Sequence, residues 1–153
     1  MTIDASMRRP AAIALAIYGT LVAIVGFFPT PVDRSASPLL RSALAALHRW
    51  GVPDWFDYDV VEFTANIALF VTFGVLAVLA FGRRRAWLAV LAGAAASATI
   101  EICQWLLLPA RFPTGLDVLA NTIGTVIGAA IGYGVLVMRA PAAGAPARAI
   151  REP

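Results

Sequence analysis

The sequence predicts an all-α polytopic membrane protein with four transmembrane helices and a short amphipathic interfacial helix in the first outer loop. Of its 153 residues, 60% are hydrophobic and 14% are charged, and the mean hydropathy is +0.79. That composition is typical of an integral membrane protein and excludes an ordinary soluble domain. Four apolar runs are each close to the roughly 20 residues that cross a bilayer core as a helix. They are Ala11–Phe28, Val61–Phe81, Ala86–Leu108 and Val118–Met138.

The first run has a second interpretation as a cleaved signal peptide, because Arg8 and Arg9 precede it. It is longer than the apolar segment of a typical signal peptide, and the small residues at 35–37 lie well beyond its end. We therefore expect a retained helix.

Arginine placement predicts the orientation of the helices. If the amino terminus is cytoplasmic, eight arginines fall in cytoplasmic segments and four in external ones. Basic residues concentrate on the cytoplasmic side of membrane proteins, so both termini are predicted to be cytoplasmic. The chain then divides into a cytoplasmic amino terminus (1–10), a four-helix membrane domain (11–138) and a cytoplasmic tail (139–153). The tail is rich in alanine, proline and glycine, so we expect it to be disordered.

The long outer connection predicts a helix of its own. Ser37 and Pro38 are typical of a helix start, and the residues that follow place leucines on one face and Arg41, His48 and Arg49 on the other. We expect this helix to lie flat on the outer membrane surface. His48 is expected to be solvated, because no second histidine or cysteine stands at metal-ligand spacing.

Three predicted helices carry polar side chains near the outer membrane surface. The pairs are Glu62 and Asn66, Glu101 and Gln104, and Asp117 and Asn121. The members of each pair are three or four residues apart and therefore project from one helix face. Ionisable groups at membrane depth are costly and usually mark a site, so we expect this layer to be functional.

Arg111, in the short loop before the last helix, is expected above this layer. It is the expected charge partner of Glu101 or Asp117, and its guanidinium could equally bind a phosphate or carboxylate. Three carboxylates against one arginine leave negative charge, which a proton or a cationic ligand would balance.

Glycines continue the stripe of the last helix. Gly124, Gly128 and Gly132 lie near the face that carries Asp117 and Asn121. Small residues at this spacing let a neighbouring helix approach closely, so the stripe predicts a packing face that turns both polar residues into the bundle. A purely structural reading stays open, in which Asp117 is stabilised by the helix dipole and Asn121 joins two helices.

Three stretches of the chain resemble the VanZ-like family of membrane proteins, named for a teicoplanin resistance factor. They are VEFTANIALFVTFG (61–74), IEICQW (100–105) and RFPTGLDVLANTIGTVIG (111–128). The resemblance rests on an ordered series of residues: Asn66, Glu101, Gln104, Arg111, Asp117, Asn121 and Gly124. Thr72 departs from it, standing where the family's Phe-x-Pro-x-Gly pattern has proline.

The resemblance implies a multi-pass protein of the bacterial cytoplasmic membrane whose relatives can lower sensitivity to teicoplanin or related lipoglycopeptides. We expect an outward-facing pocket that binds or modifies an envelope lipid or lipid-linked precursor, or alternatively a structural or partner-binding protein. An enzyme would use Glu101 and Asp117 as acid and base, and the sequence leaves this open. Membrane lipids are the expected partners, and no metal, cofactor or nucleic acid is expected.

Overall fold

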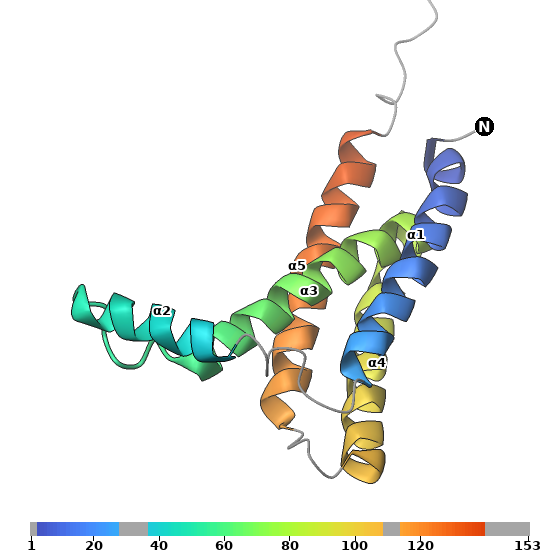
Figure 1. Cartoon of the computed structure of the whole chain (residues 1–153). Coiled ribbons are helices and arrows are strands. Elements are labelled where there is room, and N and C mark those ends of the chain that lie inside the picture. The colour runs from blue at the N-terminus through green and yellow to red at the C-terminus, as the bar shows by residue number, and fades with distance from the viewer. Residues whose placement is uncertain (1–2, 28–36, 109–113, 140–153) are drawn as a thin grey trace, which may run out of the picture.

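The computed structural model describes residues 3–27, 37–108 and 114–139, and this part of the chain contains helices and no strand (Figure 1). The elements are α1 (Ile3–Gly26), α2 (Ser37–Arg49), α3 (Tyr58–Phe81), the 3-10 turn η2 (Arg83–Arg85), α4 (Ala86–Leu107) and α5 (Gly115–Met138). Four of these helices, α1, α3, α4 and α5, are long and apolar enough to cross a membrane. The predicted all-α architecture is confirmed. The predicted tail (139–153) lies outside the described residues except for Arg139.

Three of the four spanning helices begin earlier than their apolar runs do. α1 starts at Ile3 rather than Ala11 and runs through Pro10, and α5 starts at Gly115 rather than Val118. Backbone hydrogen bonds do not require apolar side chains, so a helix can begin several residues before its apolar run begins. α3 begins where the side chain of Asp57 accepts a 3.2 Å hydrogen bond from the backbone N–H of Val60, which satisfies one free donor of the first turn.

The centre of the bundle is the close contact between α3 and α5. α5 presents Gly124 and Gly128, and a Cβ atom on either would overlap a backbone carbonyl of α3, from Ile67 and Val71 respectively. On α3, Gly74 has the same role, because a Cβ atom there would overlap the carbonyl oxygen of Thr125 on α5. The two backbones therefore touch directly, which only residues without side chains permit.

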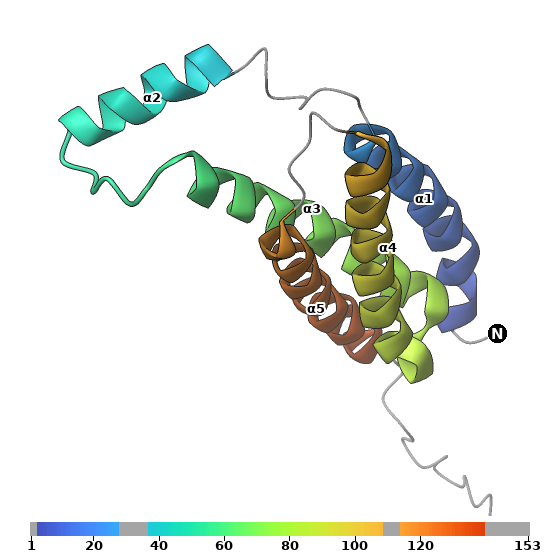
Figure 2. The same ribbon diagram turned by 90° about the horizontal axis from the view of Figure 1, so that it is seen from below.

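The remaining spanning helices flank this pair. α1 packs mainly on α3, and α4 packs on α5 and α3 (Figure 2). The hydroxyl of Tyr18 on α1 donates a 2.8 Å hydrogen bond to the carbonyl of Leu69 on α3. On α4, Gly93 leaves space for the side chain of Thr125.

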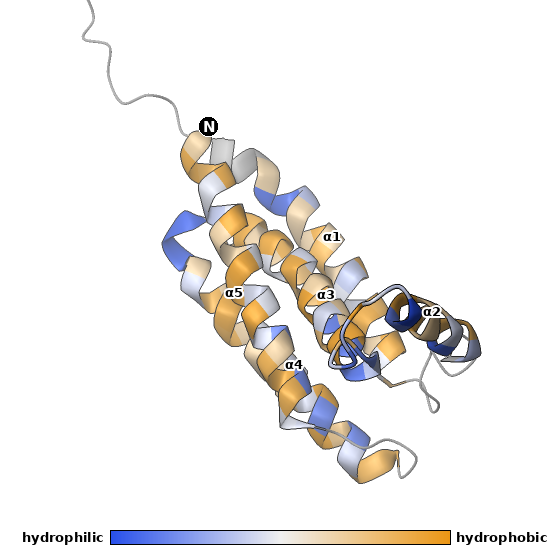
Figure 3. Cartoon of the chain, turned by 90° about the vertical axis from the view of Figure 1, so that its left-hand side faces the viewer, coloured by the Kyte–Doolittle hydropathy of each residue, from blue (hydrophilic) through white to orange (hydrophobic). Residues whose placement is uncertain are grey.

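The two ends of the bundle differ in chemistry. At one end, the start of α1 contacts both the α3–α4 turn and the end of α5. The guanidinium of Arg8 lies against Gly82 of the turn. Arg139, just after α5, donates a 3.4 Å hydrogen bond to the sulfur of Met7. The Arg83–Arg85 triplet adjoins this end and forms a hydrophilic segment in Figure 3. The adjoining half of the bundle is filled by an apolar core of Ala77, Val78, Ala89, Ala129 and Leu136.

α2 projects away from the bundle beyond the start of α3 (Figures 1 and 2). Leu44 is buried, whereas Leu39 and Trp50 are among the most exposed large apolar side chains. The expectation of a solvated His48 is wrong, because its Nε2 forms a 3.0 Å hydrogen bond with the carbonyl oxygen of Phe56 and the side chain is half-buried. The chain reverses after α2 through Gly51, whose φ of 96° suits glycine, and this reversal returns Phe56 to the helix.

Replacement of Gly128 by alanine should destabilise the bundle, because the added methyl group would press on the carbonyl of Val71. We expect the free energy of unfolding to fall by about 1–3 kcal/mol, the usual cost of overpacking. Gly134→Ala is the matched control on the same helix, since its Cβ would meet nothing within 4 Å. The control should be neutral or stabilising by up to about 1 kcal/mol. Equal losses in detergent unfolding followed by circular dichroism would contradict the close contact.

Candidate functional site

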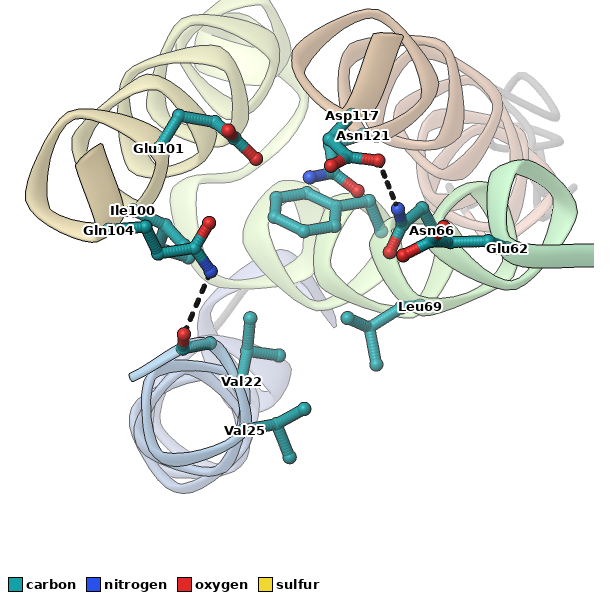
Figure 4. Close-up of a pocket in the computed structure, with 12 residues that line it drawn as sticks. Val22, Val25, Glu62, Asn66, Leu69, Ile100, Glu101, Gln104, Asp117 and Asn121 are labelled. Atoms are coloured by element: carbon teal, nitrogen blue, oxygen red, sulfur yellow. Dashed lines mark hydrogen bonds between the residues drawn. The ribbon is translucent and has the colours of Figure 1, made fainter. Parts of the chain in front are cut away.

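A cavity of about 100 Å³ lies between the four spanning helices, in the half of the bundle opposite the apolar core. Figure 4 shows polar side chains from α3, α4 and α5 turned toward one another, with apolar side chains of α1 below them. All six polar residues predicted from helices α3, α4 and α5 line it: Glu62, Asn66, Glu101, Gln104, Asp117 and Asn121. Arg111 lies outside the described residues, so its place above the cavity stays a prediction.

Asp117 and Asn66 join α5 to α3 across the cavity wall. The side-chain amide of Asn66 donates a 2.8 Å hydrogen bond to Oδ1 of Asp117 (Figure 4). Asp117 lies in the first turn of α5, where the helix dipole favours a negative charge. These two interactions hold a carboxylate at the rim of the cavity in a set orientation.

Asn121 lies one turn deeper on the same face of α5. Its Nδ2 donates a 2.8 Å hydrogen bond to Oγ of Ser97 on α4, and its own backbone carbonyl accepts one from Thr125. The side chain is only 7% exposed, yet its Oδ1 has no hydrogen-bond partner within the described chain. A buried acceptor without a donor costs about 1–3 kcal/mol, so this oxygen is available for a donor that enters the cavity.

Gln104 closes the cavity toward α1. Its Nε2 donates a 2.8 Å hydrogen bond to the carbonyl of Gly26, the last residue of α1 (Figure 4). Carbonyls in the last turn of a helix lack partners inside the helix, so this bond satisfies one of them and attaches the end of α1 to α4. Gln104 is 6% exposed and its geometry indicates a positioning role.

Two further cavities adjoin the first and share its carboxylates. One, of about 280 Å³, lies between α4 and the start of α5 and includes Glu101 in its wall. The other, of about 150 Å³, lies between the starts of α3 and α5 and includes Glu62 and Asp117. Glu101 is half-buried and about 9 Å from the end of α4, given a rise of about 1.5 Å per residue. Each of the three acidic side chains therefore lines two of the three hollows.

Some residues that line or support the cavity were not predicted from the sequence. Val22, Val25 and Gly26 of α1 line the cavity, although the first helix contains no polar motif there. Thr125 lies four residues after Asn121, on the same helix face, and this spacing could have identified it as a partner. Among the residues that the structure describes, no group of three histidine, cysteine, aspartate or glutamate side chains could hold a metal ion.

The fold and cavity define a multi-pass helical membrane protein with a polar cavity between its spanning helices. The family model VanZ/LLP1 matches residues 15–138, and the chain belongs to this family. The family resemblance carried by the three sequence stretches is thereby confirmed. No curated protein and no solved structure matches the chain.

A double-mutant cycle should show that Asn66 and Asp117 are coupled. Asn66→Leu and Asp117→Leu each remove the 2.8 Å hydrogen bond, so their combined effect on the free energy of unfolding should be smaller than the sum of the two. The expected coupling is about 0.6–1.7 kcal/mol, the range of hydrogen bonds between membrane helices. Strict additivity in detergent unfolding would contradict the interaction.

Proposed function

We propose that this VanZ/LLP1 protein lies in the bacterial cytoplasmic membrane and uses its polar cavity to bind the head of an envelope lipid or lipid-linked precursor. Through this binding it would reduce sensitivity to teicoplanin or related lipoglycopeptides. The observation that carries the proposal is the cavity lined by polar groups from three helices, with the buried Oδ1 of Asn121 left for a ligand. Polar groups inside a membrane bundle are costly and usually functional.

The proposed orientation places both termini in the cytoplasm and the cavity in the outer leaflet. It is supported by the gathering of Arg8, Arg139 and the Arg83–Arg85 triplet at the end of the bundle opposite the cavity. Basic residues favour the cytoplasmic side. The α4–α5 connection, which contains Arg111, then lies outside.

A structural or partner-binding role is the second candidate. Two observations favour it: the bond between Asn66 and Asp117 and the bond between Gln104 and Gly26 each link two helices. Polar side chains can hold membrane helices together without any ligand. An enzymatic variant would use Glu101 and Asp117 as acid and base.

Cysteine labelling tests the orientation. In a background in which the native Cys103 is replaced by alanine, Gly115→Cys should react with a membrane-impermeant maleimide added to intact cells, and Arg84→Cys should not. Both positions are exposed at the ends of helices, so labelling of each after membrane disruption is the control. The reverse pattern in intact cells would contradict an outward-facing cavity.

A teicoplanin sensitivity assay tests the role of the cavity. Glu101→Gln and Asp117→Asn keep the shape of each side chain and remove its charge, so each should abolish the difference in inhibitory concentration between cells with and without the protein. Thr99→Val is the matched control, because Thr99 is an exposed residue of α4 that bonds to its own helix.

Quantified membrane levels distinguish the outcomes. Full resistance in both variants at normal levels would refute a ligand-binding cavity, and loss of both proteins from the membrane would favour the structural role. Equal sensitivity with and without the wild-type protein would refute the link to teicoplanin.

A further inference from the structure

We propose that the arginine-rich end of the bundle is a binding surface for anionic phospholipid. The guanidinium groups of Arg8, Arg83 and Arg139 bind the phosphate of a lipid in the adjoining leaflet, and the bound lipid joins the three segments that carry them. This surface is separate from the polar cavity, and the inference does not depend on what the cavity binds.

Two contacts bring these arginines together from three segments of the chain. The guanidinium of Arg8, near the start of α1, lies against Gly82, the residue directly before Arg83. Arg139, just after α5, donates a 3.4 Å hydrogen bond to the sulfur of Met7, the residue directly before Arg8. The start of α1 thereby lies between the α3–α4 turn and the end of α5, and each segment adds an arginine to the same surface.

The guanidinium groups have donors to offer a ligand. An arginine side chain carries five N–H donors, and the thioether sulfur that Arg139 contacts is a weak acceptor. Arg8, Arg83 and Arg139 are all exposed. The planar fork of a guanidinium matches the oxygens of a phosphate and binds two of them at once. Exposed arginines from three segments can therefore surround one phosphate group.

The charge of this end is strongly positive. The acidic side chains that the structure describes lie toward the other end, before and at the start of α3, near the end of α4 and in the first turn of α5. In the sequence, residues 1–10, 82–86 and 139–153 hold eight arginines against two carboxylates, those of Asp4 and Glu152. Two carboxylates cannot neutralise eight arginines. Basic residues next to a membrane span attract anionic lipids, and the attraction grows with each one.

The depth of these arginines favours a lipid over a phosphate in solution. α3 ends its membrane span at Phe81, and Arg83 begins the next one. Trp87, the second residue of α4, is 62% exposed. Exposed tryptophan side chains of spanning helices lie preferentially at the level of the lipid headgroups. The turn that carries Arg83 is therefore placed where lipid phosphates lie.

Retention of lipids by the purified full-length protein tests this surface. The protein is reconstituted in equimolar phosphatidylglycerol and phosphatidylcholine and extracted in mild detergent, and its bound lipids are counted by native mass spectrometry. We expect bound phosphatidylglycerol to exceed phosphatidylcholine by more than about tenfold, because each basic residue near the surface contributes a preference of about fivefold for anionic lipid.

Matched double variants locate the surface. Arg8→Gln with Arg139→Gln should lower the preference by about tenfold or more, whereas Arg41→Gln with Arg49→Gln removes two exposed charges from α2 and should leave most of it. Arg8→Lys with Arg139→Lys keeps the charge without the fork and should retain only part of the preference. Circular dichroism checks that each variant keeps its helices. If the first variant unfolds, Arg83→Gln should lower the preference by about fivefold.

Each contrary outcome would overturn a stated part of the inference. Equal losses in the two double glutamine variants would overturn the location of the surface. A lysine variant equal to the wild-type protein would overturn phosphate binding by the guanidinium groups. Competition by soluble glycerophosphoglycerol as strong as that by the lipid, at matched ionic strength, would overturn the lipid as its source. Equal retention of the two lipids by the wild-type protein would overturn the inference as a whole and leave the proposed function of the cavity standing.

Discussion

The direct contact between the backbones of α3 and α5 is the constraint on which the rest of this structure depends. Lipid chains are as apolar as the helices, so close packing must supply much of the force that holds the bundle together. Gly124 and Gly128 allow that packing, and they continue the helix face that carries Asp117 and Asn121. The contact thereby sets the register that brings Asn66 to Asp117.

A second consequence is the division of the bundle into two halves. Toward the arginine-rich end, small and branched side chains fill the space between α3, α4 and α5. Toward the other end, the same helices present amides and carboxylates, which surround a cavity instead of a core. Polar groups inside a bundle need hydrogen-bond partners, and here they lie around a cavity, at the end of the bundle where the sequence changes from alanine and valine to glutamate, asparagine and glutamine.

The spanning helices and the polar layer could be predicted from the sequence because both depend on patterns of nearby residues. The four spanning helices follow from apolar length, and the polar layer follows from pairs spaced by three or four residues. Contacts between distant segments left no such pattern. The bond from Gln104 to the carbonyl of Gly26 uses a backbone atom that every residue has, and the partner of His48 depends on how the chain turns after α2. The hollow between α4 and the start of α5 likewise depends on how the two helices pack, which the spacing of residues along the chain does not predict.

The pattern of satisfied and unsatisfied groups separates the residues that join helices from the one that the proposed ligand would meet. A cluster that served packing alone would pair its buried polar atoms, as Gln104 does with Gly26 and Asn66 does with Asp117. Asn121 differs, because the bond to Ser97 holds one side of its amide and leaves the other side buried without a described partner. Helix-joining bonds thus account for the fixed geometry of the site, and they do not account for the remaining acceptor at its centre. Under the proposed function, that acceptor, rather than the number of carboxylates, distinguishes a binding site from a polar joint between helices.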